Sequence, residues 1–219
     1  MYYSIIIPVH NEAVTLNKLL YELKQFSKEK HEIIIIDDGS TDDSYNILNK
    51  CTYIRLISFK KNMGKGSAIR IGLEEASNDK IVIFDGDMEI DLYEIKKLMV
   101  LNKEINIDCA FGSRFDQMPP FTSFWNFGNL IFTIIFNIKH NADLPDALCC
   151  AKTFYKKDID IKSLKSIGFD IDIELATILI KKKGSNTLVK KINYKRRSIK
   201  QGKKLKLIDG WTILKRILK

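Results

Sequence analysis

Apolar runs alternate with helical patterns through the first half of the chain. Continuous apolar runs, rich in Ile and Val, occupy residues 3–9, 32–37, 54–59 and 81–84. Between and after them, apolar residues recur at the spacing of amphipathic helices. A strand that is apolar at almost every position is typical of a parallel sheet covered on both faces. The alternation therefore predicts an α/β fold, with a mostly parallel central sheet and helices on both faces.

Polar side chains follow each of these predicted strands. Right-handed crossovers bring the carboxyl ends of parallel strands to one edge of a sheet, where ligands bind in open α/β folds. We therefore expect a set of polar residues to converge at this edge: Glu12, Asp37, Asp38, Asn62, Lys65, Asp85 and Asp87.

Two carboxylates come directly after the strand at 81–84. Asp85 and Asp87 are separated only by Gly86, so both can turn oxygens toward one hard cation. Mg²⁺ and Mn²⁺ prefer such ligands and often bridge to phosphate. The same side chains could instead cap the backbone of a turn at the strand end.

The regular alternation ends after Leu101. A helix is expected from about Asp91 to Leu101 and another from about Gly168 to Lys182, and residues 107–112, 148–155 and 187–194 have strand character. Residues 124–138 are strongly apolar and aromatic, but about 15 residues are too few to span a bilayer. This segment is either a buried helix or one that lies against lipid.

Basic residues gather at the end of the chain. Of the net charge of +9, residues 181–219 contribute +14, with 15 Lys and Arg against one acid, Asp209. Such a segment suggests an anionic partner: a phosphate, a nucleic acid or a membrane surface. Residues 209–219 form a short basic amphipathic pattern, which either binds anionic lipid or packs on the domain.

Several classes of protein are disfavoured. The four cysteines include no C-x-x-C pair, so a zinc site or a disulfide framework is not expected and a reducing compartment fits. The chain enters a strand pattern at once, which predicts no signal peptide. Neither a P-loop nor a G-x-G-x-x-G turn is present, which disfavours Walker ATPases and dinucleotide dehydrogenases.

The chain resembles family 2 glycosyltransferases with the A-type nucleotide-sugar fold. It is most similar to their polyprenyl-phosphate branch, typified by dolichyl-phosphate mannose and glucose synthases. The resemblance rests on eight segments in order: IIIPVHNE, IIIIDDGSTDDS, NMGKGSAIRIGLEEAS, FDGDMEID, FGSRF, LPDALCCAK, GFDIDIELA and YKRRSIKQGKKLKLIDG.

The resemblance implies a nucleotide-sugar donor, linked to UDP or GDP, and a divalent metal on its diphosphate. The implied donor-binding residues are Pro8, Glu12, Asp37, Asp38, Asn62, Lys65, Asp85, Gly86 and Lys203. Mg²⁺ or Mn²⁺ would be held by Asp85, Asp87 and Glu89, where Glu89 stands in place of the family's usual Gln.

The resemblance also implies four catalytic residues: Asp87, Asp172, Arg114 and Arg197. Arg114 would meet a phosphate, while Arg197, Lys203 and Lys204 would form a basic loop over the departing diphosphate. Transfer would invert the anomeric carbon. A hydroxyl acceptor needs a general base, either Asp172 or Asp146, whereas a lipid phosphate is already anionic and needs none.

Two features depart from the family pattern. Cys150 and Ala151 replace a Gly and an aromatic residue, and residues 115–128 contain no Arg or Lys that could meet a lipid phosphate. These departures favour another acceptor, whereas the basic tail and the apolar segment favour the lipid.

We therefore expect a single domain over residues 1–219, with a donor-binding half (1–104), an acceptor half (105–194) and a basic loop with a short helix (195–219). The expected activity is metal-dependent transfer of a hexose to a polyprenyl phosphate, by a peripheral protein on the cytoplasmic face of the membrane. The alternatives are transfer to a sugar hydroxyl in cell-surface glycan synthesis, a nucleotidyltransferase, and a non-catalytic nucleotide-binding or membrane-surface protein. No nucleic-acid partner is expected, because the tail offers only Tyr194 and Trp211 for base stacking.

Overall fold

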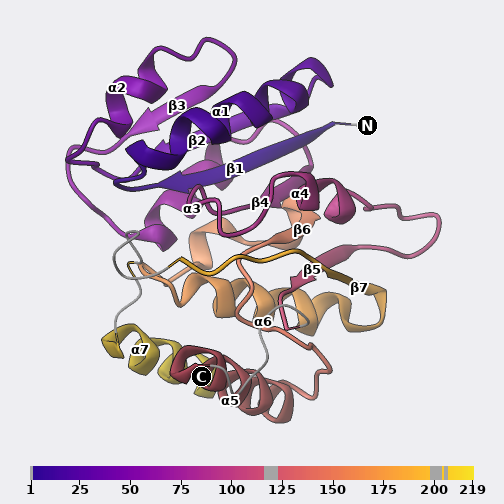
Figure 1. Ribbon diagram of the computed structural model, residues 1–219. Helices are drawn as coiled ribbons and strands as arrows, with labels where there is room; N and C mark the ends of the chain where they lie inside the picture. The colour runs from indigo at the N-terminus through magenta and orange to yellow at the C-terminus, as the bar shows by residue number, and fades with distance from the viewer. Residues whose placement is uncertain (1, 116–122, 198–203, 205–206) are drawn as a thin grey trace.

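The computed structural model describes residues 2–115, 123–197, 204 and 207–219. Within these residues the centre is a seven-stranded sheet with the order β3-β2-β1-β4-β6-β5-β7 (Figure 1). Strand β6 is antiparallel to its neighbours β4 and β5, and the other neighbours pair in parallel. The strands are β1 (Tyr3–Val9), β2 (Glu32–Asp37), β3 (Arg55–Ser58), β4 (Lys80–Ile83), β5 (Cys109–Ser113), β6 (Lys152–Tyr155) and β7 (Thr187–Lys191). The predicted α/β fold is confirmed.

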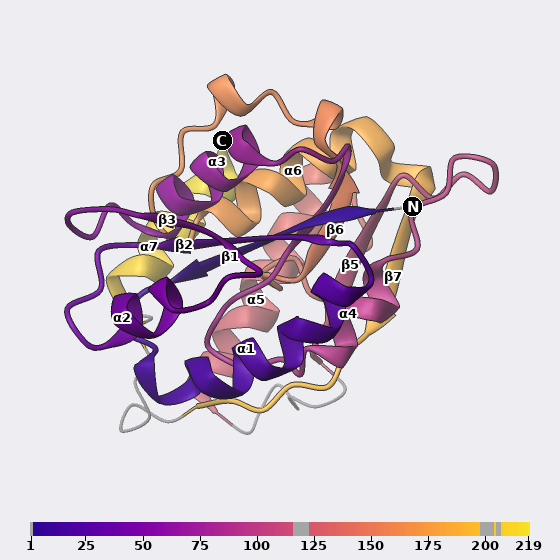
Figure 2. The same cartoon turned by 90° about the horizontal axis from the view of Figure 1, so that it is seen from above.

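Helices cover both faces of the sheet (Figure 2). One face carries α1 (Ala13–Lys28), α2 (Ser44–Asn49) and α4 (Tyr93–Leu98), and the other carries α3 (Lys65–Glu75) and α6 (Ile171–Lys183). Helices α5 (Phe124–His140) and α7 (Leu207–Leu218) pack on each other and on α6, forming an outer layer (Figure 1). The described residues also include the short 3-10 helices η2 (Lys156–Asp158), η3 (Ile161–Ser163) and η4 (Gly184–Asn186).

Side chains of β1 enter the cores on both faces of the sheet. Ile5 and Ile7 pack with α1, whereas Ile6 packs with α3 on the opposite face. Gly72 of α3 allows this second contact, because a Cβ there would lie 2.4 Å from Ile6 Cγ2. The apolar run of β1 is continuous because helices cover the strand on both faces of the sheet, as the sequence predicted.

Three elements differ in extent from the prediction. The strand expected at 148–155 begins only at Lys152, because the residues before it pass the rim of the sheet and Cys150 lines a pocket there. The helix expected at about 91–101 covers only Tyr93–Leu98. The last strand ends at Lys191, although Tyr194 forms an isolated bridge with Ile90.

The apolar segment at 124–138 forms most of helix α5. Asn126, Thr133 and Phe136 are buried against the domain, while an apolar stripe on the same helix is exposed. Helix α7 packs on the domain through Ile213 and Ile217. Among the residues described, no helix combines the length and the apolarity needed to cross a bilayer.

Candidate active site

A pocket of about 830 Å³ lies at the carboxyl edge of the parallel strands. The expected convergence of polar residues is found here, with the exception of Asp37. The predicted site residues that line the pocket are Pro8, Glu12, Asp38, Asn62, Lys65, Asp85, Gly86, Asp87, Glu89, Arg114, Asp172 and Arg197. Lys203 lies outside the described residues.

The two adjacent aspartates after β2 have different surroundings. Asp37 does not line the pocket; its carboxylate accepts hydrogen bonds from the Ser40 N–H and the Ser58 hydroxyl, each at 3.1 Å. Asp38 does line it, and accepts from the N–H groups of Met63 (2.6 Å) and Gly64 (2.9 Å). Burial raises the pKa of Asp38 above its usual range. Asp37 therefore stabilises the ends of β2 and β3, while Asp38 stabilises the loop before α3.

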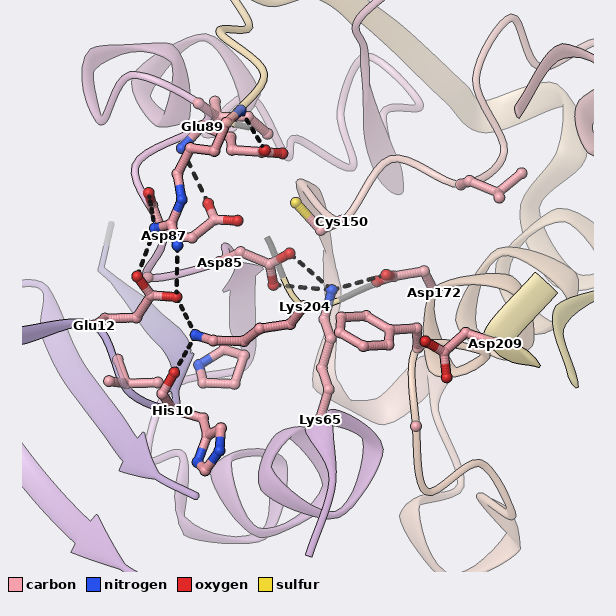
Figure 3. A pocket seen from close by; sticks show the side chains of 18 of the residues that line it. His10, Glu12, Lys65, Asp85, Asp87, Glu89, Cys150, Asp172, Lys204 and Asp209 are labelled. Carbon is pink, nitrogen blue, oxygen red and sulfur yellow. Dashed lines mark hydrogen bonds and ion pairs between the residues drawn. The ribbon is translucent and has the colours of Figure 1, made fainter. Parts of the chain in front are cut away.

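Lys65 lies between two carboxylates at the centre of the pocket (Figure 3). Its Nζ is 2.9 Å from Asp85 and 2.8 Å from Asp172, and sits 5.8 Å from the centre of the Phe169 ring. Burial alone would lower the pKa of Lys65, but Asp172 and Asp85 raise it well above its usual value. Lys65 is therefore a fixed cation that links the end of β4 to the start of α6.

Glycine at position 66 makes this link possible. A Cβ on Gly66 would lie 2.3 Å from the Ser166 carbonyl oxygen, so only glycine lets the loop before α6 approach the start of α3. The Gly66 N–H donates to the Ile167 carbonyl at 2.6 Å. This contact holds the loop before α6 against the helix that carries Lys65.

Asp87 lies among other acids. Burial, and then the charges of Asp85 and Glu89, raise the pKa of Asp87 to about 7. Its carboxylate accepts a hydrogen bond from the Glu89 N–H at 3.0 Å. The repulsion between Asp85 and Asp87 is of the kind that a divalent cation relieves.

Glu89 does not join these two carboxylates. Its side chain accepts from the Tyr194 hydroxyl at 2.5 Å and from the Arg197 N–H at 2.7 Å, and its carbonyl accepts from the Lys195 N–H at 2.7 Å. In the described part of the chain, no three His, Cys, Asp or Glu residues form a group that could hold a metal ion. Glu89 therefore anchors the segment 194–197 in this structure, and its expected role in the metal site stays a prediction.

Two cations from the basic C-terminal segment meet Glu12. Arg197 Nη1 lies 2.5 Å from Glu12 Oε2 and also donates to the Asp87 carbonyl at 2.9 Å. The Lys204 ammonium donates to Glu12 and to the His10 carbonyl (Figure 3). Glu12, the expected ligand of the nucleotide, is thus ion-paired with the loop expected to meet the diphosphate.

Arg114 and Asp146 form a buried bidentate ion pair. Arg114 Nε and Nη2 lie 2.7 and 2.8 Å from the two carboxylate oxygens of Asp146, and the Arg114 N–H adds a third bond at 3.1 Å. The guanidinium also sits 5.3 Å from the centre of the Tyr194 ring. Because both oxygens of Asp146 are engaged, this carboxylate is poorly placed to act as a general base.

Most of the chain matches a known protein family. The family model described as glycosyl transferase family 2 matches residues 4–161. The chain belongs to glycosyltransferase family 2. The predicted family and the predicted enzyme class, a glycosyltransferase, are both confirmed.

Two curated relatives are similar to part of the chain. Over 94 residues the chain is 34% identical to the uncharacterized glycosyltransferase YkcC of Bacillus subtilis (strain 168), covering 40% of this chain and 29% of the relative. Over 110 residues it is 34% identical to an undecaprenyl-phosphate 4-deoxy-4-formamido-L-arabinose transferase of Proteus mirabilis (strain HI4320), covering 46% and 33%. The aligned segments thus span about a third of the curated relatives' length.

Solved structures confirm the A-type glycosyltransferase fold. Glucosyl-3-phosphoglycerate synthase from Mycobacterium tuberculosis, in complex with Mn²⁺, UDP-glucose and phosphoglyceric acid, superposes with a TM-score of 0.75 at 16% identity. The match covers 99% of this chain and 78% of the other. The same enzyme with Mn²⁺, UDP and glucosyl-3-phosphoglycerate gives 0.71 at 14% identity.

The residues of this glycosyltransferase fit a divalent metal at the strand end. Asp85 and Asp87 offer hard oxygen ligands, and the raised pKa of Asp87 reflects its burial and then the negative charges of Asp85 and Glu89. Asp172 Oδ1 is buried and has no hydrogen-bond partner among the described residues, although Lys152 lies 4.0 Å away. Asp85 and Asp87 would hold the ion.

Sequence reasoning did not single out several residues of the pocket wall: Trp125, Asn129, Phe169, Tyr194, Arg196, Asp209 and Ile213. Trp125, Asn129 and Ile213 lie in apolar segments, whereas Phe169, Tyr194, Arg196 and Asp209 lie in two of the segments that carry the family resemblance. Cys150 also lines the pocket, where its family usually has glycine. A hydrogen bond with Cys149 and burial raise the pKa of Cys150 well above its usual range, so it is a neutral thiol.

Proposed function

We propose that this protein transfers a hexose from a UDP- or GDP-linked donor to a polyprenyl phosphate, with inversion, as a peripheral protein on the cytoplasmic face of a membrane. Residues 1–104 would bind the donor, 105–194 the acceptor, and the basic segment 195–219 would close the site. The Proteus mirabilis relative, named as an undecaprenyl-phosphate sugar transferase, supports this acceptor class.

One observation carries the choice of acceptor: both candidate general bases are held by cations. Asp172 lies 2.8 Å from Lys65 and 4.0 Å from Lys152, and Asp146 is held by Arg114. A carboxylate engaged by ammonium or guanidinium groups has fewer oxygen lone pairs free to accept a hydroxyl proton. A hydroxyl acceptor would need one of them as a base, whereas a phosphate oxygen is already a nucleophile.

The reaction then needs no proton transfer. An oxygen of the lipid phosphate forms a bond to the anomeric carbon, and the bond from that carbon to the donor diphosphate breaks on the opposite side. Mg²⁺ or Mn²⁺ on Asp85 and Asp87 would neutralise charge on the diphosphate. Arg197 and Lys204 lie at the same rim, where their cations would favour the departing diphosphate.

Ion pairs that now hold Glu12 also fit this sequence of events. Arg197 and Lys204 neutralise Glu12. A bound diphosphate offers them more negative charge than one carboxylate does, and Glu12 is then released toward the nucleotide. The basic segment would in this way exchange one anion for another on donor binding.

Turnover with matched acceptors tests the proposal. The purified protein is given UDP- and GDP-sugars with Mg²⁺ or Mn²⁺, and either a short polyprenyl phosphate or the corresponding polyprenol. Product that appears with the phosphate and not with the alcohol supports the proposal. Transfer to a sugar hydroxyl, with no response to polyprenyl phosphate, would overturn it and favour cell-surface glycan synthesis.

A further inference from the structure

Helix α5 carries an exposed apolar stripe. Phe124, Phe127, Ile131, Ile134 and Ile138 are separated by alternating steps of three and four residues, which places them on one side of the helix. Ile138 is 78% exposed and Phe124 is 71% exposed. Five large apolar side chains in a row form a larger patch than the isolated apolar residues of an ordinary protein surface.

Helix α7 packs against α5 and exposes a second apolar group. Ile208, Trp211 and Leu218 are exposed on it, while Ile213 and Ile217 face the domain. Both helices lie in the layer farthest from α1, at the bottom of Figure 1. We use the term α5–α7 face for the exposed residues Phe124, Phe127, Ile131, Ile134, Ile138, Ile208, Trp211 and Leu218.

The exposed charges on these two helices have one sign. Helix α5 contains no acidic residue, and its last turn carries Lys139. On α7, Lys215 and Lys219 are exposed, and Lys215 Nζ sits 5.4 Å from the centre of the Trp211 ring. The one acid of α7, Asp209, lines the catalytic pocket instead. An apolar stripe flanked by lysines, with a tryptophan among them, has the composition of a helix that lies at a lipid interface.

The same two helices also form a wall of the catalytic pocket. Trp125 and Asn129 of α5, and Asp209 and Ile213 of α7, line it. One helix, roughly 10 Å across, therefore separates the α5–α7 face from the site of transfer. An apolar helix face sinks about 5–10 Å into the boundary between headgroups and acyl chains, so the headgroup layer would reach the level of the pocket.

We infer that the α5–α7 face docks on an anionic lipid bilayer and holds the catalytic pocket beside the headgroups. The inference extends the proposed function and depends on it only for the identity of the acceptor. A second copy of the chain fits this face less well, because it would bring the lysines of two copies together. Anionic headgroups are complementary to them.

Vesicle binding by exposed-residue variants tests the inference. The probes are vesicles of equal parts phosphatidylglycerol and phosphatidylcholine, and vesicles of phosphatidylcholine alone. Ile134→Glu and Ile138→Glu should each lower the partition coefficient about tenfold or more, because each replaces an apolar side chain that would enter the bilayer with a charged one. Val14→Glu is the matched control, since Val14 is 97% exposed on α1 and should change nothing.

Lysine substitutions and tryptophan fluorescence test membrane binding independently of the apolar variants. Lys139→Gln and Lys219→Gln should each weaken binding to the anionic vesicles about fivefold, with little effect on neutral ones. Emission from the wild type should shift to the blue on vesicle binding, and Trp211→Phe should remove most of that shift. Circular dichroism verifies that each variant is folded.

Different outcomes separate the inference from the proposed function. Equal vesicle binding by the wild type, Ile138→Glu and Val14→Glu overturns the inference even if polyprenyl phosphate is the acceptor in detergent. Light scattering that shows a dimer dissociated by Ile138→Glu, with no vesicle binding, also overturns it and assigns the face to a second copy. Loss of vesicle binding in Ile138→Glu supports the inference, even if the acceptor proves to be a sugar hydroxyl.

Discussion

The Lys65 ammonium lies 2.8 Å from the carboxylate of Asp172 and 2.9 Å from that of Asp85, which follows β4. The Lys65–Asp172 pair joins two segments 107 residues apart in the chain. It gives Asp172 the character of a structural counter-ion. The sequence motif alone could not distinguish that role from a catalytic base, because the acidic start of α6 also suits the helix N-terminus.

Asp172→Asn should therefore slow transfer to polyprenyl phosphate only modestly, by roughly tenfold or less, because no proton is removed. The pH profile of kcat should keep its shape on the acidic side. Steady-state kinetics over a pH series measures both. A loss of several hundredfold, with an acidic limb that disappears in the variant, would identify Asp172 as a general base and reject the counter-ion role.

Removing the cation of this pair should cost stability. Lys65→Met leaves Asp85 and Asp172 without their shared partner, and breaking a buried ion pair costs about 3–5 kcal/mol. Urea unfolding measures the change. The double variant Lys65→Met with Asp172→Asn should recover part of the loss, because the second change removes one of the unpaired charges; an additive loss would show that the two residues do not interact.

Glu89 allows the metal-ligand and anchoring roles to be separated. Glu89→Gln keeps an oxygen for the Arg197 N–H and a polar group for the Tyr194 hydroxyl, so activity should stay within a few-fold of wild type. Glu89→Ala removes the anchor and should lower kcat/KM for the donor tenfold or more, because Arg197 is no longer positioned.

Mn²⁺ titration supplies the control for the Glu89 variants. The affinity for the ion should change by no more than a few-fold in Glu89→Gln and Glu89→Ala, because Glu89 contributes charge near Asp87 but no ligand. A drop in Mn²⁺ affinity of more than tenfold in Glu89→Gln would restore Glu89 to the metal site and contradict the anchoring role.

Sequence reasoning succeeded where local pattern and chain topology sufficed. The apolar runs at β1, β2 and β4 indicated a doubly covered sheet, and the topology rule placed Glu12, Asp38 and Asp85 at one rim. It could not choose between partners for a side chain when one of the partners lies far away in the sequence. Whether Glu89 faces a metal or Tyr194 depends on the path of a segment more than a hundred residues later, which no local pattern encodes.

The Arg114–Asp146 pair should act on stability more than on the chemical step. Asp146→Ala leaves a buried guanidinium uncompensated, which costs about 3–5 kcal/mol. Thermal unfolding should show a marked fall in Tm. Asp143→Ala is the matched control, because Asp143 is exposed in the same loop and its removal should change the free energy of unfolding by less than about 0.5 kcal/mol. A stable but inactive Asp146→Ala variant would instead assign Asp146 to catalysis.

Asp87 makes stability depend on pH and on the metal. Its pKa is raised to about 7, so the folded protein holds a proton on Asp87 more tightly than the unfolded chain does. The stability gained from this bound proton is fully present below about pH 4 and is lost as the pH rises through 7. The free energy of unfolding should fall by at least ~1 kcal/mol over this range, because a tenfold difference in proton affinity corresponds to ~1.4 kcal/mol. Asp87→Asn should flatten this dependence in urea unfolding without metal. Mg²⁺ or Mn²⁺ should stabilise the wild type more at pH 7 than at pH 5 and leave Asp87→Asn nearly unchanged. Equal metal stabilisation of both proteins would remove Asp87 from the metal site.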